Sequence, residues 1–341
     1  MPTVWTPSRL HFGLLSLAGD DAAWPDRRGE PRLPARRFGG VGLMVERPGV
    51  QVSTALAAEW TADGPLAERA LAFARCFVES IRADRPDAVL PPQHIVVESA
   101  PPEHVGLGVG TQLGLAVARG LAEAWGLVLD ATELAGRVGR GLRSALGVHG
   151  FAHGGFLVES GKRPGAEGFA PLAVRAPFPS EWRLVLAIAS AARGRHGMEE
   201  QQAFAQLARQ RLRTQETEAL CRVVLLGMLP ALAEADLEAF GECLYDFNAR
   251  VGEAFAAVQG GVYADARTAD CAAFLRGEGV RGVGQSSWGP TVFAVVGDED
   301  RASQLRHQLA RRFGLESAAA WTTAACNHGA DVTASGTAGG R

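Results

Sequence analysis

Residues 104–120 read HVGLGVGTQLGLAVARG, a glycine-rich loop that opens directly into a predicted helix. Gly106, Gly108 and Gly110 have no side chain, so a ligand can approach the backbone, and left-handed dihedrals can turn successive N–H groups inward. A helix beginning near Thr111 leaves its first N–H groups unpaired and favours an anion by roughly 0.3–2 kcal/mol from its dipole. The junction therefore predicts a phosphate site, and the alternative is a glycine-rich turn that binds nothing.

The loop does not follow the two best-known nucleotide-binding patterns. No Gly-Lys-Ser/Thr sequence follows it, so no lysine reaches the phosphates as in a Walker loop. A dinucleotide fingerprint fits only with Thr111 in its last position, and Asp130 follows a predicted helix rather than a strand. The loop needs another explanation.

The composition is that of a globular protein and excludes several classes. The 341 residues, 47% hydrophobic and 21% charged, predict one large or two medium domains. A net charge of −3 argues against a nucleic-acid partner, and no run of about 18 apolar residues predicts a membrane span. The N-terminus lacks the pattern of a signal peptide, and the scattered cysteines form no CxxC pair. We expect a cytoplasmic protein with reduced thiols.

Hydrophobic patterning predicts alternating strands and helices in the first half. Pro48-Gly49 marks a turn between two strands, and the glycines at 147, 150, 154 and 155 argue against a helix there. The predicted strands are 9–17, 40–54, 94–99 and 154–160, and the predicted helices are 65–84, the segment after the glycine loop, and 131–142.

A Pro/Gly-bearing stretch at 161–179 is the best candidate for a domain boundary. It divides the chain into an N-terminal domain (1–170) and a C-terminal α+β domain (171–325), followed by a small polar tail (326–341) that we expect to be disordered. The second half is predicted to contain strands at 183–190, 282–295 (two, around a loop) and 316–325, and helices at 198–229, 231–257, 265–277 and 298–313. One apolar stripe is predicted to face the core: Leu237, Phe240, Leu244, Phe247 and Val251.

Three segments resemble, in order and spacing, the motifs of the GHMP kinase superfamily. They are TPSRLHFGLLSL (6–17), PPEHVGLGVGTQ (101–112) and GVGQSSWGPTVFAV (282–295). More narrowly, HFGLL, GLGxGTQ and GQSSWGP resemble the β-ribofuranosylaminobenzene 5′-phosphate synthase family, over about residues 3–325. GTQ and QSSWGPT are the more specific signatures, because ordinary GHMP kinases lack them.

The resemblance implies an α+β fold with a ribosomal-protein-S5-like N-terminal domain, a ferredoxin-like C-terminal domain and a site between them. It implies phosphoribosyl pyrophosphate and 4-aminobenzoate as substrates, Mg²⁺ as cofactor and a homodimer. The products would be β-ribofuranosylaminobenzene 5′-phosphate, CO₂ and pyrophosphate, in methanopterin biosynthesis. Either a 4-amino or a 4-hydroxy group would activate the ring.

The alternative is an ATP-dependent GHMP small-molecule kinase, and the motifs depart from it. Where related kinases place an aspartate that assists the attacking hydroxyl, this chain has Gly147. Arg9 replaces the usual lysine, and Leu14-Leu15 replaces an acidic-His pair. Ribosyl transfer explains these losses: if the attacking ring carbon loses CO₂, no base is needed there. The reaction needs instead groups that bind the leaving pyrophosphate, and one prepositioned donor commonly lowers the activation barrier by about 3–4 kcal/mol.

Candidate residues follow from the motifs. Arg9 and His11 alternate on one face of a predicted strand, where Arg9 suits a phosphate or carboxylate. His11 is either a donor to the leaving group or a core histidine. Arg143 completes the predicted catalytic set, with a solvent-exposed arginine as the alternative. Val109 stands where the family commonly has serine, so one hydroxyl contact is missing.

The remaining candidates are predicted to bind substrate or metal. Thr111 is either a ligand contact or a helix cap, and Trp288 either stacks on an aromatic substrate or is structural. Glu200, in the first turn of a predicted helix, is the candidate Mg²⁺ ligand, with helix stabilisation as the alternative. The predicted substrate-binding residues are Gly106, Gly108, Gly110, Thr111, Gln112, Ser144, Gly197, Gln285, Ser286, Ser287 and Trp288.

Overall fold

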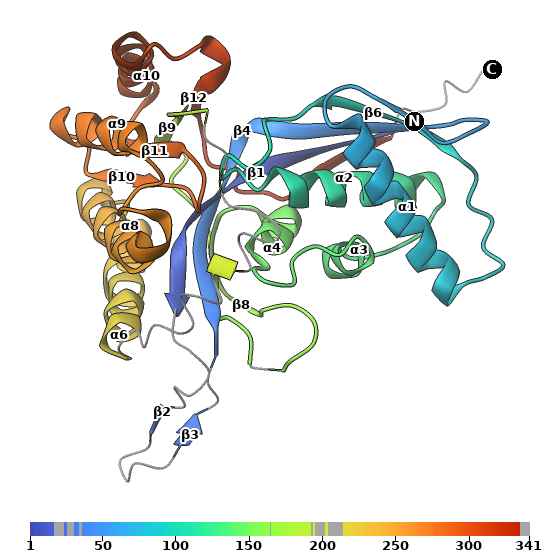
Figure 1. Cartoon of the computed structure of the whole chain (residues 1–341), viewed down its shortest axis with the longest axis horizontal. Helices are drawn as coiled ribbons and strands as arrows, with labels where there is room; N and C mark the ends of the chain where they lie inside the picture. The colour runs from blue at the N-terminus through green and yellow to red at the C-terminus, as the bar shows by residue number, and fades with distance from the viewer. Residues whose placement is uncertain are drawn as a thin grey trace.

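The computed structural model describes residues 1–16, 24–25, 31–33, 36–163, 165–191, 194, 202–203 and 214–334. These residues form an α+β structure with one larger and one smaller sheet. Two long strands, β1 (Pro2–Ser16) and β4 (Phe38–Leu56), run through the larger sheet toward the smaller one (Figure 1). The end of β1 that carries Arg9 and His11 thus lies where the two layers meet.

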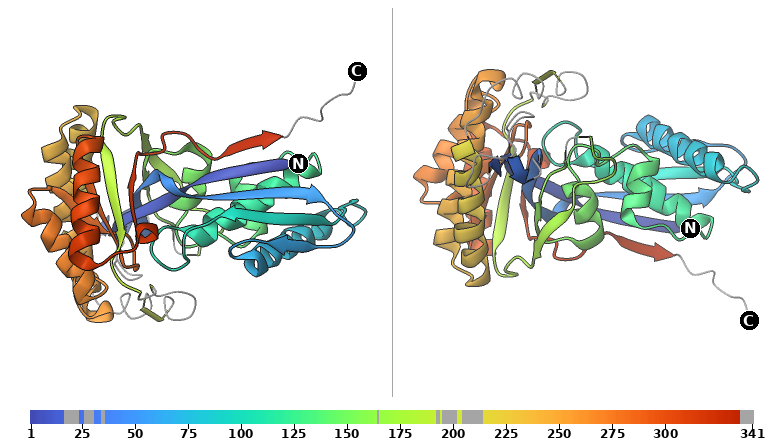
Figure 2. Two further views of the ribbon diagram at one scale, coloured as in Figure 1. Left: turned by 90° about the horizontal axis from the view of Figure 1, so that it is seen from above. Right: turned by 90° about the horizontal axis from the view of Figure 1, so that it is seen from below.

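The larger sheet has the strand order β13-β1-β4-β6-β5, and β7 and β8 join it beside β4. β4 serves two neighbours, because its residues 40–43 pair with β7 and its residues 51–56 pair with β6. Helices α1 (Ala67–Asp84), α2 (Val109–Ala124) and α4 (Leu146–His153) pack against it, and α3 (Ala131–Arg137) packs against these helices (Figure 2). The other strands are β5 (Thr61–Asp63), β6 (Gln93–Ser99), β7 (Phe156–Glu159), β8 (Leu172–Ala176) and β13 (Asp331–Ala334).

The smaller sheet has the order β10-β11-β9-β12, all antiparallel. This is the strand order of a ferredoxin-like β-α-β-β-α-β unit, as expected. Its helices form the outermost layer on that side (Figure 2). The elements are β9 (Arg183–Ile188), α6 (Thr214–Val223), a π-helix (Val224–Met228), α7 (Leu229–Ala233), α8 (Leu237–Gln259), α9 (Ala266–Gly277), β10 (Gly282–Gln285), β11 (Thr291–Val296), α10 (Glu299–Phe313), a 3₁₀ turn (Ser317–Ala319) and β12 (Ala320–Thr323). A two-stranded ribbon, β2 (Trp24–Pro25) and β3 (Pro31–Leu33), lies apart from both sheets.

Two local predictions in the N-terminal half are wrong. Pro48-Gly49 does not separate two strands: β4 continues through it, and the partners shift from Val45 to Val50, so residues 46–49 bulge out of the ladder. A helix does form at the glycines after Arg143. A side chain at Gly150 would lie 2.2 Å from Met44 Sδ, so glycine is what lets α4 pack closely on β4.

The boundaries of the expected domains also differ from the structure. β8 pairs with β7, so the larger sheet extends to Ala176, beyond the expected boundary at 170. The segment 326–341 is not disordered over its described part, because β13 pairs with β1 and Cys326 is buried. Composition missed this strand because ladder hydrogen bonds use the backbone and need no apolar side chains on an edge. Residues 335–341 lie outside the described residues.

Aromatic side chains join the two layers into one core. The Phe12 ring on β1 lies 5.0 Å from Phe293 of the smaller sheet and 6.3 Å from Phe156 of the larger one, between ring centroids. Phe156 in turn contacts Phe240 of α8 at 6.1 Å. The predicted stripe on α8 is confirmed as buried from Phe240 to Val251. No helix in the described ranges is both long and apolar enough to cross a membrane.

Gly150→Ala is expected to destabilise the fold by about 1–3 kcal/mol, since the added methyl group overlaps Met44. Gly136→Ala is the control. Gly136 also lies in a helix, but a methyl group there meets no atom within 4 Å, so alanine should stabilise by up to about 1 kcal/mol. Urea unfolding of both variants measures the difference. Equal stabilities would contradict the close packing of α4 on β4.

Candidate active site

The three motif segments meet at one serine hydroxyl. Ser286 Oγ donates to the carbonyl of Gly106 at 2.6 Å and accepts from the backbone N–H of His11 at 3.0 Å. The next residue, Ser287, donates its backbone N–H to the His11 carbonyl at 3.0 Å. Segments far apart in the sequence are thereby held within hydrogen-bonding distance of one another.

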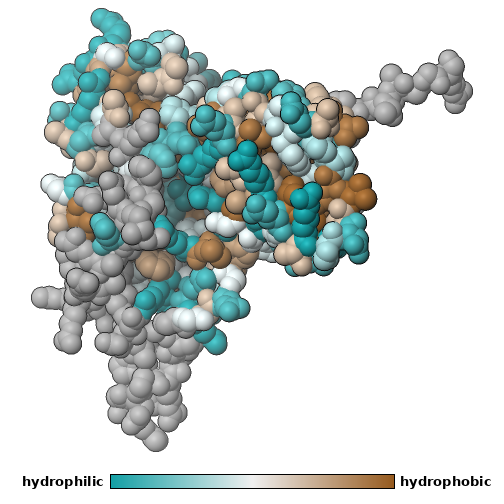
Figure 3. Space-filling model, turned by 45° about the vertical axis from the view of Figure 1, so that its right-hand side comes forward, coloured by the Kyte–Doolittle hydropathy of each residue, from teal (hydrophilic) through white to brown (hydrophobic). Residues whose placement is uncertain are grey.

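Two adjoining cavities open at this junction. The polar pocket, with a volume of about 630 Å³, is lined by the glycine loop, by Glu103 and by four arginines: Arg9, Arg69, Arg140 and Arg143. The apolar pocket, of about 110 Å³, is lined mainly by Phe12, Leu14, Phe38, Val251, Phe255 and Val262. A recess bordered by hydrophilic residues is visible between the two parts of the molecule (Figure 3). The residues shared by both pockets are Arg9, Arg143, Ser144, Ser287 and Trp288.

The three loop glycines have different surroundings. A Cβ on Gly106 would lie 2.2 Å from the Ser286 carbonyl oxygen, so this glycine admits the neighbouring loop. Gly108 caps α2 with a φ of 72° and faces the Arg9 side chain. A Cβ on Gly110 would lie 3.1 Å from Arg69 Nη2 and 3.3 Å from Arg140 Nη2. Because Gly110 has no side chain, two guanidinium groups can approach the first turn of α2 closely.

Two of the predicted binding residues have structural partners instead. Gln112 is fully buried, accepts from the Thr6 hydroxyl and donates to the Gly147 carbonyl at 2.8 Å. It links α2 to β1 and α4 and lines neither pocket. Ser286 is likewise fully buried, makes the two hydrogen bonds described above and lines neither pocket. Gln112 and Ser286, which belong to the two more specific motifs, therefore link the segments to one another.

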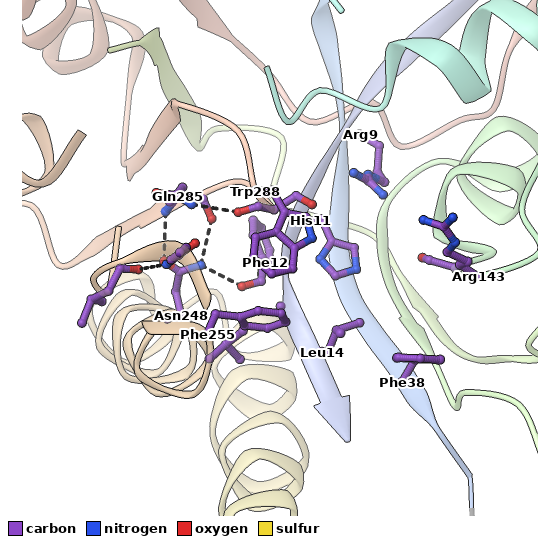
Figure 4. A pocket seen from close by; sticks show the side chains of 17 residues that line it. Arg9, His11, Phe12, Leu14, Phe38, Arg143, Asn248, Phe255, Gln285 and Trp288 are labelled. Atoms are coloured by element: carbon purple, nitrogen blue, oxygen red, sulfur yellow. Dashed lines mark hydrogen bonds between the residues drawn. The ribbon is translucent and has the colours of Figure 1, made fainter. Parts of the chain in front are cut away.

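The other predicted residues that the structure describes line one or both cavities. Thr111 lies in the polar pocket and accepts from Arg140 Nη2 at 3.3 Å. Arg9, on β1, also donates its backbone N–H to the Leu107 carbonyl at 3.0 Å, which fixes the glycine loop. Arg9 and Arg143 lie on one side of His11, and Trp288 and Phe255 lie on the other (Figure 4). The arginines thus face the polar pocket where it meets the aromatic rings.

His11 is 6% exposed and lines the apolar pocket. Burial, and secondarily the positive charge of Arg9, lowers the pKa of His11 well below 6.5. The imidazole is therefore neutral near pH 7, which makes it a poor acid for the leaving group. It can still donate one hydrogen bond and accept another.

The wall of the apolar pocket includes residues that the sequence did not single out. Phe255 meets Trp288 edge to face, with ring centroids 4.5 Å apart. Phe255 continues the α8 stripe four residues beyond Val251, so the predicted periodicity contained this signal. Asn248 donates to the carbonyls of Phe12 and Gln285 at 2.7 and 2.9 Å and accepts from the Gln285 N–H at 2.9 Å. This amide fixes β10 against β1.

The loop after β10 is held in place by Gln285. Its side chain accepts from the Ala264 N–H at 2.6 Å and donates to the Ser287 carbonyl at 2.9 Å. Ser287 has a φ of 55°, which is unfavourable for a residue with a Cβ and is maintained by these contacts. Ser287 and Trp288 are thereby presented to both pockets.

Glu159, at the end of β7, is a buried carboxyl group that the sequence analysis did not single out. Desolvation raises its pKa, although the N–H of Ala145 donates to Oε2 at 2.6 Å. Its Oε1 has no hydrogen-bond partner among the described residues, and a side chain at Gly40 would lie 3.0 Å both from that atom and from His11 Nε2. Glu159 lines neither pocket, so it is placed to orient α4 and His11 rather than to meet a substrate. An acidic residue inside the apolar run GGFLVES was the available signal.

Gly197 and Glu200 lie outside the described residues. Across the ranges that are described, no group of three or more His, Cys, Asp or Glu side chains is arranged to hold a metal ion. His149 on α4 is hydrogen-bonded to the Ala170 carbonyl at 2.8 Å.

Gly106→Ala is expected to destabilise the protein by about 3 kcal/mol or more, from overlap with the Ser286 carbonyl added to a left-handed φ of 95°. The matched control is Gly168→Ala. Gly168 has a φ of 78° but no atom within 4 Å of the added methyl, so only about 1–2 kcal/mol of backbone strain is expected. Thermal and urea unfolding report both values. A mild Gly106→Ala variant would mean that the loops do not approach so closely.

Glu159→Gln is expected to change how stability depends on pH. Because the pKa of Glu159 is raised in the folded state, the unfolded chain loses this proton first, starting near the ordinary value of 4.5. Between that value and the raised pKa, the free energy of unfolding of the wild type should fall relative to the variant as pH rises. Urea titrations of both proteins across this range measure the difference. A constant difference would show that the carboxyl group is not desolvated.

Comparison with known proteins places the chain in a family. The family model described as the GHMP kinases N terminal domain matches residues 69–155, and the one described as GHMP kinases C terminal matches residues 228–315. The structure is similar to a homoserine kinase from Cytophaga hutchinsonii (TM-score 0.66, 15% identity, 97% of this chain and 96% of that one). It is also similar to a phosphomevalonate kinase from Streptococcus pneumoniae (TM-score 0.64, 9% identity, 95% and 99%). These likenesses confirm the expected fold.

Curated relatives are more similar in sequence. A beta-ribofuranosylphenol 5'-phosphate synthase of Methanothermobacter thermautotrophicus is 34% identical over 315 residues, covering 86% of this chain and 88% of the relative. One of the same name from Archaeoglobus fulgidus is 31% identical over 307 residues, covering 85% and 86%. The chain therefore belongs to the GHMP kinase superfamily and, within it, to the family of enzymes named beta-ribofuranosylphenol 5'-phosphate synthases.

Proposed function

We propose that this enzyme joins phosphoribosyl pyrophosphate to a benzoate with an electron-donating para group, through a carbon–carbon bond, and releases CO₂ and pyrophosphate. The observation that carries the proposal is that a pocket lined by four arginines shares a wall with a pocket lined by aromatic rings. One cavity suits a polyanion and the other suits a flat ring, and the two substrates would meet at Arg9, Arg143 and Ser287.

The polar pocket fits phosphoribosyl pyrophosphate in size and charge. Its four arginines face a single described carboxylate, Glu103, so the lining is strongly cationic. Arginine binds phosphate oxygens with paired N–H donors, and the first turn of α2 adds the positive end of the helix dipole.

The apolar pocket fits the benzoate ring. Phe255 and Trp288 present ring edges and faces, and Arg143 at the shared wall suits the carboxylate. The resemblance of the motifs implies 4-aminobenzoate, whereas the names of the relatives specify a phenol product. Either para group pushes electrons toward the ring carbon that carries the carboxylate, so we include 4-hydroxybenzoate as an equal candidate.

The reaction balances without a protein base. The ring carbon bearing the carboxylate forms a bond to C1 of the ribose, and the C1–oxygen bond breaks with its electron pair passing to pyrophosphate. The bond to the carboxylate then breaks, its pair restores the aromatic ring, and CO₂ leaves. No proton has to be removed. This agrees with Gly147, whose missing side chain faces Thr111 and Gln112 where related kinases have an aspartate.

Mg²⁺ is part of the proposal in a limited form. Glu103 is paired with Arg69 at 2.9 Å, so the described lining does not form a protein cage for the ion. Mg²⁺ usually keeps few protein ligands when it accompanies phosphates. We propose that it enters on the pyrophosphate and neutralises part of its charge. A cytoplasmic homodimer acting in methanopterin biosynthesis is proposed from the resemblance alone.

A GHMP kinase is the second candidate, favoured by the fold of the structural neighbours. The absence of a carboxylate at Gly147 weighs against it. Phosphoryl transfer also needs a group that orients the attacking hydroxyl, and glycine cannot supply one.

The test is to incubate the purified enzyme with phosphoribosyl pyrophosphate, Mg²⁺ and carboxyl-labelled 4-aminobenzoate or 4-hydroxybenzoate. Labelled CO₂ should appear in equal amount to pyrophosphate with at least one acid, and the aromatic product should contain no label. Phe255→Ala should raise KM for the acid by about tenfold or more with little change in KM for the ribosyl donor, because about 2 kcal/mol of ring contact is lost. ATP consumption with an added alcohol, and no CO₂, would replace the proposal by the kinase.

A further inference from the structure

Two arginines that no motif contains converge over the first turn of α2. Arg69 comes from α1 and Arg140 from the segment after α3, and both line the polar pocket. Their Nη2 atoms lie 3.1 and 3.3 Å from the position that a side chain of Gly110 would occupy. Resting on the proposed function, we propose that Arg69 and Arg140 form a clamp for the leaving pyrophosphate, separate from the anion site at Arg9 and Arg143.

Each arginine is held in place by neighbouring residues. Glu103 binds Arg69 Nε at 2.9 Å, and the Arg69 guanidinium lies 5.6 Å from the centre of the Phe73 ring. Arg140 donates Nη2 to the Thr111 hydroxyl at 3.3 Å. A guanidinium has five N–H donors, and these contacts position each side chain at the wall of the polar pocket. Glu103 is a positioning residue in this arrangement.

The geometry of displacement decides which anion reaches this clamp. The acceptor ring occupies the apolar pocket, so C1 of the ribose lies at the shared wall, near Arg9, Ser287 and Trp288. An attacking carbon and a leaving oxygen lie in line on opposite faces of C1. The pyrophosphate therefore points away from Phe255, along the polar pocket toward Gly110 and the first turn of α2. The 5′-phosphate lies on the face of the ribose that the ring attacks, closer to Arg143.

The same geometry predicts a kinetic signature. Negative charge develops on the pyrophosphate as the C1–oxygen bond breaks, so fixed cations at that end stabilise the transition state more than the bound substrate. Loss of either clamp arginine should reduce kcat as well as affinity for inorganic pyrophosphate. Loss of a residue that only bound the substrate would act on KM.

The experiment compares Arg69→Met and Arg140→Met with Arg119→Met, a control on α2 that is paired with Glu123 and lines neither pocket. Calorimetry with inorganic pyrophosphate should show affinity reduced about 10- to 100-fold in both clamp variants and unchanged in the control. Affinity for ribose 5-phosphate should change by less than about threefold. Glu103→Gln should weaken pyrophosphate binding less than Arg69→Met does.

Wild-type affinity for pyrophosphate in both clamp variants would overturn the proposal, as would a larger loss for ribose 5-phosphate than for pyrophosphate. Thermal unfolding checks that each variant is folded, and Arg140→Lys, which keeps the charge but not the fork, should fall between wild type and Arg140→Met. These binding measurements need no turnover. If the wild type binds pyrophosphate through the clamp but releases no CO₂ from either benzoate, the proposed function fails and the clamp does not.

Discussion

The Ser286 hydroxyl, bonded to both the Gly106 carbonyl and the His11 N–H, is the contact on which the site depends. It joins β1, the glycine loop and the loop after β10, which come from both sheets. The approach is so close that a side chain at Gly106 or Gly289 would overlap backbone atoms of the facing loop. A shift of either layer would therefore open the wall that the two pockets share. The proposed alignment of two substrates thus depends on the stability of this junction.

This arrangement explains how a kinase scaffold can support another reaction. The glycine loop still leads into the first turn of α2 beside the polar pocket, Gly147 occupies the position where the resemblance places a kinase aspartate, and four arginines line the polar pocket. The buried carboxyl group of Glu159 lines neither pocket and accepts a hydrogen bond from the Ala145 N–H at the start of α4. In the proposed reaction, catalysis depends on holding anions and orienting a ring, with CO₂ leaving in place of a proton.

The sequence predicted where the motifs lie, but not which of their residues line the pockets and which link other segments. Periodicity predicted α2 and the α8 stripe, because burial of one helix face leaves a regular pattern. The sequence pattern could not show that Gln112 and Ser286 bind other segments. A hydroxyl or an amide gives the same pattern whether it binds a ligand or the carbonyl of a distant residue. Arg69 and Arg140 carry no local signal at all: they meet only because α1 and the segment after α3 pack beside the same loop. The helix at Gly150 was not predicted, because the glycine there is required by close packing against Met44, which belongs to another element.

The central claim is that a ring and a diphosphate bind in separate pockets that meet at Arg9 and Ser287. The most direct measurement is a crystal structure of the enzyme with inorganic pyrophosphate and 4-hydroxybenzoate bound together. The ring should lie against Phe255 and Trp288, with its carboxylate toward the shared wall and the diphosphate beside Gly110. A ring bound in the arginine-lined cavity, or an acidic side chain in contact with the ring carbon that bears the carboxylate, would contradict it.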